Sequence, residues 1–446
     1  MSGEISPLHQ DYRDQKVSPL EVCQQHLREA VSTGSPLNAF ADILTDEALY
    51  ASEASAARYR ESRPLSVLDG IPVTIKDLFH VQGTVTGCGS QAAETRLQTR
   101  DAVIVDQLKK LGAVIFGKTN LLEYAYGLVH PEIGPARNPW DMRRTIGGSS
   151  SGSAAAVAAG LGLASIGTDT AGSIRNPAAF GGVVGFKPTY GRLSAEGLVP
   201  LSPSLDHVGL LARSVSDVQV VFDALSTDPK PRAEKEETWR VAVTDLPYTT
   251  PEVTRVFGDF IEKLQRTESL MEGFAFDWET ANAAALTIIS AEAYAIHADH
   301  LRESWDGYSM GTRIRLAAAS SVSARDYMRA RQVAQHLKTQ WRQRTQSFDI
   351  LLLPTLPMEA PFEEEGPGDD LAAATLYTST FALLGVPAVS VPVGLTVNGL
   401  PVGLQIVGHV GQDQAVLEFA KHVETIRGEI SHAPLYARMG TRGGGL

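Results

Sequence analysis

The sequence predicts an α/β fold with a largely buried sheet, and two features of the chain carry that prediction. Short apolar runs typical of strands alternate with helical segments and glycine-rich turns over residues 71–186. The alternation returns after residue 349, beyond a mostly helical stretch at 251–346 that holds few glycines. The strands of one core therefore come from both ends of the chain. We predict a single domain over residues 1–446, with residues 240–346 as a helical insert or cap within it.

The N-terminal helices are predicted first. Ser18-Pro19-Leu20-Glu21 is a capping box with proline at the first helical position, and apolar residues at helical spacing extend that helix to about Ser32. A second helix is expected from Asp46 to about Arg60. The strands expected after it are 71–75, 113–116, 164–167 and 183–186.

The rest of the chain divides at a charged, proline-containing segment, DPKPRAEKEE, which we expect to be an exposed connection. After the helical stretch, strands are expected at 350–353, 388–393 and 402–407, and helices near 371–384 and 413–426. The final TRGGGL is expected to be disordered.

Composition excludes several classes of protein. The chain of 446 residues is 43% hydrophobic and 20% charged, which is ordinary for a globular protein. Its net charge of -12 argues against a nucleic-acid or anionic-membrane surface. Neither a membrane-spanning run nor a signal peptide is present in the sequence, so we expect a soluble, cytoplasmic protein. The two cysteines, Cys23 and Cys88, are too few for a disulfide framework or zinc site and are expected to be buried.

One motif suggests phosphate binding. Residues 112–119, GAVIFGKT, fit the pattern G-x-x-x-x-G-K-[ST]. That chemistry needs the four intervening residues to form a loop whose N–H groups surround phosphate. Here they are Ala-Val-Ile-Phe, which predicts a buried strand, so we interpret the match as a coincidence.

A second motif suggests a nucleophile elbow. Residues 148–152, GSSSG, fit G-x-S-x-G with Ser150 at the centre. An elbow needs a buried strand that leads directly into the turn. The preceding RNPWDMRR cannot form that strand, although later aspartates and histidines leave the triad order open.

Two small-residue loops favour a third interpretation. GGSSSGS at 147–153 leads into an alanine-rich helix, and GTDTAGSIR occupies 167–175. A nucleophilic hydroxyl needs an approachable site, N–H donors for the developing oxyanion, and a base. Taken singly, either loop is explained equally well by tight turns.

Together with GIPVTIKD at 70–77, these loops resemble the amidase signature family. The resemblance runs from GGSSSGSAAAVAAG at Gly147 through GTDTAGSIRNPAAFGGVVGFKPTYGRLS to Ser194. It continues in LGVPAVSVPVG at 384–394 and GLPVGLQIVG at 399–408, and so covers most of the chain outside the helical stretch. It implies the amidase signature fold: a mixed central β-sheet flanked by helices on both faces.

The resemblance also implies roles for individual residues. The family's Ser–cis-Ser–Lys triad falls on Ser173 as nucleophile, Ser149 as bridging serine beside a cis peptide, and Lys76 as base. A lysine acts as a base only when neutral, and burial beside Ile71, Val73 and Ile75 shifts its pKa in the required direction. No metal or cofactor is implied.

The oxyanion hole is expected from the backbone N–H groups of Thr170, Ala171, Gly172 and Ser173. Ala171 and Ser151 depart from the commonest family pattern, and an alanine predicts φ below zero at position 171, or strain. Asp169 and Arg175 are interpreted as a buried charge pair that holds this loop in shape. Tyr126 and Gly127 lie at the family's position near the acyl site.

The predicted function is therefore that of an amidohydrolase (EC 3.5.1-like) acting on a small aryl or alkyl amide, a carbamate or a urea-like molecule. The family's glutamine-hydrolysing amidotransferase branch carries an acidic residue where this chain has Gln412, which favours a stand-alone enzyme. Two alternatives remain: a glutamine-hydrolysing amidotransferase subunit in a complex, and an inactive scaffold subunit. Neither nucleic acid nor membrane is an expected partner, and a homodimer is left open.

Overall fold

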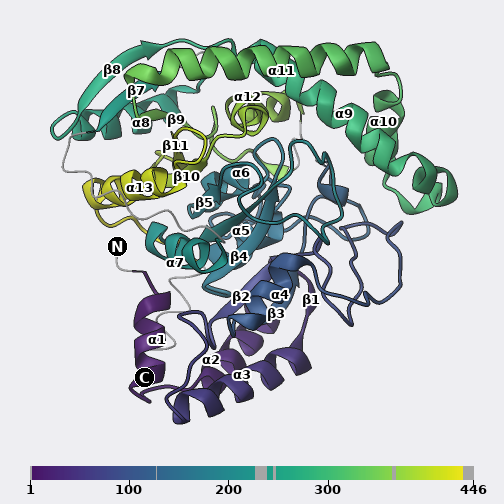
Figure 1. The fold of residues 1–446 in the computed structure, drawn as a ribbon, viewed down its shortest axis with the longest axis vertical. Coiled ribbons are helices and arrows are strands. Elements are labelled where there is room, and N and C mark those ends of the chain that lie inside the picture. Colours follow the sequence, from purple (N-terminus) through teal and green to yellow (C-terminus); the bar gives the residue numbers. More distant parts are fainter. Residues whose placement is uncertain (1–2, 127, 227–238, 245–247, 364–367, 435–446) are drawn as a thin grey trace.

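A single mixed sheet organises the molecule (Figure 1). The computed structural model describes residues 3–126, 128–226, 239–244, 248–363 and 368–434. Within them, eleven strands follow the order β1-β3-β2-β4-β6-β5-β10-β11-β9-β7-β8. The strands are β1 Phe40–Ile43, β2 Pro72–Lys76, β3 Val114–Thr119, β4 Ala164–Asp169, β5 Val184–Lys187, β6 His207–Ala212, β7 Arg240–Thr244, β8 Ser269–Phe274, β9 Ile350–Pro354, β10 Ala388–Leu395 and β11 Pro401–Val407.

Helices cover both faces of this sheet, because alternate residues of a strand enter different cores. On β9, Ile350 and Leu352 pack with residues of α8 and α13, whereas Leu351 and Leu353 pack with residues of α9, α11 and α12. The predicted fold class is confirmed. The helices are α1 Ile5–Arg13, α2 Pro19–Glu29, α3 Thr45–Arg60, α4 Val103–Lys110, α5 Ser151–Ala158, α6 Arg175–Gly181, α7 Val215–Leu225, α8 Pro251–Leu264, α9 Trp278–Glu303, α10 Met310–Ala319, α11 Ala324–Arg344, α12 Gly368–Leu384 and α13 Asp413–Arg427.

The two ends of the chain meet in the middle of the sheet. Strand β5 pairs antiparallel with β10, with Lys187 opposite Ala388. On the N-terminal side, β2 lies parallel between β3 and β4. That arrangement places the end of β2 beside the loop that follows β4, and both belong to the site described below.

The predicted elements are largely confirmed. All seven expected strands are present, and the expected capping box begins α2, with the Ser18 hydroxyl accepting from the Glu21 N–H. The prediction missed helices α1, α6 and α7 and strands β1, β6, β7 and β8. Strand β7 pairs with both β8 and β9, so the segment 240–346 contributes two strands to the sheet as well as helices.

Helices α9, α10 and α11 lie at the end of the molecule opposite α1, α2 and α3 (Figure 1). The division into one domain with an insert at 240–346 stays a prediction. The expected connection at 228–237 and the C-terminal TRGGGL lie outside the described residues. Among the helices described, none is long and apolar enough to cross a membrane.

Candidate active site

Lys76 occupies the last position of β2, and its side chain is fully buried. Its Nζ donates to the Ser149 hydroxyl at 2.7 Å and to the Thr168 hydroxyl at 2.8 Å. Burial lowers the pKa of Lys76 from 10.5 to about 7, although the negative charges of Asp206 and Asp169 favour the protonated form. A lysine in this setting is partly neutral at physiological pH and can accept a proton.

Ser149 lies in the glycine-rich loop that precedes α5. The peptide bond between Gly148 and Ser149 is cis, and the Ser149 carbonyl accepts from the Leu122 N–H at 3.2 Å. A Cβ on Gly148 would stand 2.5 Å from Cδ1 of Leu122, so the close approach of these two loops requires glycine. The loop sequence therefore holds the Ser149 hydroxyl against Lys76.

Ser173 follows Gly172 in the loop after β4 and is partly exposed. Its carbonyl accepts from the Ser150 N–H at 3.0 Å, which joins the two serine-bearing loops. Among the described residues, the Ser173 hydroxyl makes no hydrogen bond with another group. Because the Ser149 oxygen already accepts from Lys76, its own proton is free to interact elsewhere.

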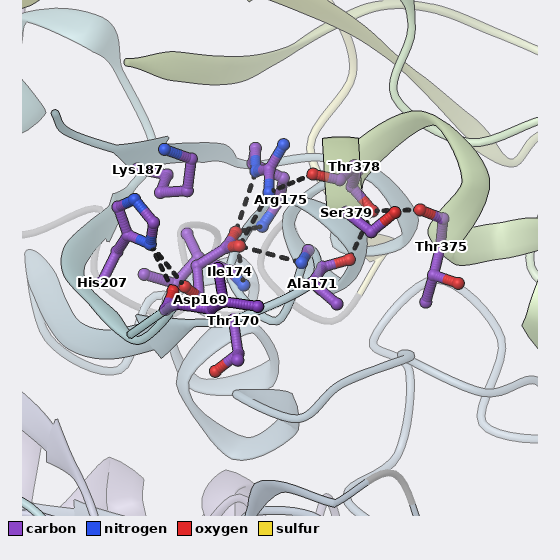
Figure 2. A network of polar contacts seen from close by, with 12 residues as sticks. Asp169, Thr170, Ala171, Ile174, Arg175, Lys187, His207, Thr375, Thr378 and Ser379 are labelled. Carbon is purple, nitrogen blue, oxygen red and sulfur yellow. Dashed lines mark hydrogen bonds and ion pairs between the residues drawn. The ribbon is translucent and has the colours of Figure 1, made fainter. Parts of the chain in front are cut away.

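A buried ion pair holds the Ser173 loop in shape, as Figure 2 shows. Arg175 and Asp169 are both fully buried, and the guanidinium donates to the carboxylate at 2.7 and 2.9 Å. Arg175 also donates to Gln405 Oε1 at 2.6 Å and to the Thr378 carbonyl at 2.9 Å. Burial alone would raise the pKa of Asp169, but the charge and hydrogen bonds of Arg175 lower it below its usual value. The predicted buried pair is thus present, with partners from α12 and β11.

The four N–H groups expected to bind an oxyanion differ in their partners. The Gly172 N–H donates to Asp169 Oδ1 at 2.8 Å. In the part of the chain that the structure describes, the N–H groups of Thr170, Ala171 and Ser173 donate no hydrogen bond. Ala171 avoids positive φ, as expected for alanine, whereas Gly172 has φ 122° and a Cβ there would stand 2.3 Å from Thr378 Oγ1.

Ser150, the centre of the alternative elbow motif, is oriented differently. Its side chain is fully buried and donates to the Thr168 carbonyl at 3.2 Å. No strand of the described chain leads into residues 148–152, since β3 ends at Thr119 and the next strand is β4. The elbow interpretation therefore lacks both an exposed hydroxyl and the strand that it requires.

The phosphate-loop pattern at 112–119 is also explained structurally. Residues Val114–Thr119 form strand β3, which is buried throughout. Lys118 is buried, forms an ion pair with Asp77 and donates to the Val85 carbonyl. Its amino group is engaged within the protein, as the interpretation of a coincidental match requires.

Tyr126 is buried beside the helical segment. Its carbonyl accepts from Arg315, whose guanidinium lies 5.4 Å from the centre of the Tyr126 ring, and its hydroxyl is 3.5 Å from Ser290 Oγ. Gly127 lies outside the described residues. Cys23 and Cys88 are free and buried, as predicted. Among the described residues, no group of three His, Cys, Asp or Glu side chains could hold a metal ion.

The sequence interpretation missed two residues at this site, Thr168 and Asp206. Thr168 is the second hydroxyl partner of Lys76. Asp206 accepts from the Thr170 hydroxyl at 2.6 Å and acts on the charge of Lys76. Both lie within segments that resemble the amidase signature family, but only the register of β4 against β2 and β6 brings them to the lysine.

Comparison with known proteins agrees with this geometry. The family model described as Amidase matches residues 21–417. The glutamyl-tRNA(Gln) amidotransferase of Anaeromyxobacter sp. (strain K) has an A-type subunit that is 34% identical over 474 aligned residues, covering 94% of this chain and 95% of that protein.

Solved structures give the same result. A crystal structure described as an amidase is 36% identical with a TM-score of 0.89, covering 95% of this chain and 100% of that one. The corresponding A-type subunit of the Thermotoga maritima glutamyl-tRNA(Gln) amidotransferase is 29% identical with a TM-score of 0.75, covering 93% and 95%. The chain therefore belongs to the amidase signature family and is a hydrolase that acts on carbon–nitrogen bonds.

Proposed function

We propose that this protein hydrolyses an amide-type bond through an acyl-enzyme on Ser173, with Ser149 as proton relay and Lys76 as base. The observation that carries the proposal is the buried contact of 2.7 Å between Lys76 Nζ and Ser149 Oγ. Burial lowers the pKa of that lysine to about 7. The neighbouring loop then supplies a partly exposed hydroxyl and N–H groups without partners among the described residues.

Acylation begins with proton transfer along this chain of groups. Neutral Lys76 takes the Ser149 proton while Ser149 takes the Ser173 proton, and the Ser173 oxygen forms a bond to the substrate carbonyl carbon. The carbonyl π electrons move to oxygen and give an oxyanion. The N–H groups of Thr170, Ala171 and Ser173 are the proposed donors to it, since Gly172 donates to Asp169.

Collapse of this intermediate reverses the proton flow. The carbon–nitrogen bond breaks, and the leaving nitrogen takes a proton that returns from Lys76 through Ser149. Water then repeats the sequence: Lys76 and Ser149 remove its proton, the oxygen attacks the acyl carbon, and Ser173 leaves with the returned proton. Thr168, which also accepts from Lys76, keeps the ammonium or amine aimed at Ser149.

The proposed substrate is a small aryl or alkyl amide, a carbamate or a urea-like molecule. Gln412 supports this choice because it is neutral at the position where the glutamine-hydrolysing branch carries an acidic residue. The second candidate is hydrolysis of glutamine within a complex, which the 34% identity to a glutamyl-tRNA(Gln) amidotransferase polypeptide favours. The absence of a nucleic-acid partner, a small-molecule substrate and a possible homodimer remain parts of the same proposal.

A substrate panel with one variant tests the proposal. Wild type and Ser173→Ala are assayed against aryl and alkyl amides, esters, carbamates, ureas and glutamine, and both are treated with a fluorophosphonate. We expect hydrolysis and labelling in wild type alone, with the label on Ser173. Activity that survives in Ser173→Ala but is lost in Ser150→Ala would overturn the assignment. An inactive scaffold would be unlabelled, and hydrolysis confined to glutamine would favour the second candidate.

A further inference from the structure

Asp206 lies immediately before β6 with its side chain 7% exposed. Its carboxylate holds two parts of the chain together. Oδ1 accepts from the Thr170 hydroxyl at 2.6 Å, and Oδ2 accepts from the N–H groups of Leu201 and Ser202 at 2.9 and 3.0 Å. Thr170 is the first residue of the loop proposed to bind the oxyanion. The position of that loop therefore depends on the Asp206 carboxylate as well as on the Asp169–Arg175 pair.

Asp206 also carries its charge close to the base. It exerts the largest electrostatic effect on Lys76 among the neighbouring groups, and that effect favours the ammonium form. Burial raises the pKa of Asp206 to about 6, while the hydrogen bonds from Thr170, Ser202 and Leu201 and the charge of Lys76 favour ionisation. The carboxylate is therefore mainly anionic above pH 6, where Lys76 loses its proton.

The other groups that face this pair have different roles. Asp169 also acts on Lys76, but its charge is matched by Arg175 in direct contact. Cys88 is buried, and burial raises the pKa of its thiol, so it stays neutral. Glu292 accepts from Ser202 and Ser204 of the loop that ends at Asp206. Within the described residues, Asp206 forms no ion pair shorter than 4.0 Å.

We propose that Asp206 is a positioning residue of this active site: its carboxylate fixes Thr170 in the oxyanion loop, and its negative charge determines how readily Lys76 gives up its proton. The inference rests on the proposed function, because it assigns Asp206 a role through Lys76 and Thr170. It makes the 201–206 loop part of the catalytic apparatus.

The test is the pH–rate profile of Asp206→Asn with a fluorophosphonate or a cleaved amide as the probe. Asparagine retains the shape of the network, since Oδ1 can accept from the Leu201 and Ser202 N–H groups and the amide can donate to Thr170. Only the charge is lost. We expect the acid-limb midpoint to fall by about one pH unit, because an opposite charge nearby is worth about 1–3 units. At high pH the rate should approach that of wild type.

Glu292→Gln is the matched control, since it neutralises a carboxylate bound to the same loop that is not among the charges acting on Lys76, and its midpoint should equal that of wild type. If Asp206→Asn does not fold, Thr170→Val serves instead: it removes a donor to Asp206, favours the neutral acid and should move the midpoint the same way. An unmoved midpoint in a folded variant that still labels at Ser173 would overturn this inference alone. A wild type without labelling or hydrolysis would reject the proposed function itself.

Discussion

Replacing Arg175 by alanine removes every bond of a side chain that is fully buried. The guanidinium donates to Asp169, to Gln405 and to the Thr378 carbonyl, and these partners come from β4, β11 and α12. In the variant, the buried Asp169 carboxylate keeps only backbone donors such as the Gly172 N–H. Removing one member of a buried ion pair costs about 3–5 kcal/mol, because the other charge is left without compensation.

We therefore expect Arg175→Ala to lower the free energy of unfolding by about 3–5 kcal/mol, a factor of about 10²–10³·⁵ in the folded-to-unfolded ratio. Urea denaturation followed by fluorescence measures this change. The loss of fixed geometry in the Ser173 loop should also reduce hydrolysis. Unchanged stability with a reduced rate would refute the structural role and indicate that Arg175 acts in the reaction.

The control is a surface pair of similar geometry. Arg302 and Asp299 lie 2.8 Å apart in α9, with side chains 71% and 88% exposed. Because exposed pairs contribute about 0–1 kcal/mol, Arg302→Ala should change stability within that range. Destabilisation of both variants by the same amount would show that burial is not the cause.

Two further predictions concern the base and the loop. The pKa of Lys76 is lowered to about 7 by burial and the neutral amine is the active form, so kcat/KM should rise with pH through about 7 and then level; a rate independent of pH between about 5 and 9 would contradict this assignment. Gly172→Ala places a Cβ 2.3 Å from Thr378 Oγ1 at φ 122° and should lower both stability and rate, the stability by about 1–3 kcal/mol. Gly258→Ala is its control, since a Cβ there meets nothing within 4 Å and favours helix α8; equal losses in the two variants would remove the steric argument.

The sequence by itself determined the local structure of this protein and the residues that carry its chemistry. Apolar runs predicted seven strands because the strand period is local, and Ser18 and Glu21 predicted a helix start because they lie within one turn of each other. It missed β7 and β8, which lie at the edge of the sheet where fewer positions face a core, and β6, which follows a segment without a strand pattern. Lys76, Ser149 and Ser173 were identified through the resemblance of their loops to the amidase signature family.

Only the tertiary structure decided how these residues meet. Lys76 contacts Ser149 and Thr168 across 73 and 92 positions of sequence, and Thr170 reaches Asp206 because β4 pairs with β6. Periodicity contains no information on strand order or register, which depend on the packing of the whole sheet. The pKa of Lys76 follows the same rule: the sequence predicts an apolar strand around it, but the burial and the neighbouring carboxylates that set its value exist only in the folded chain.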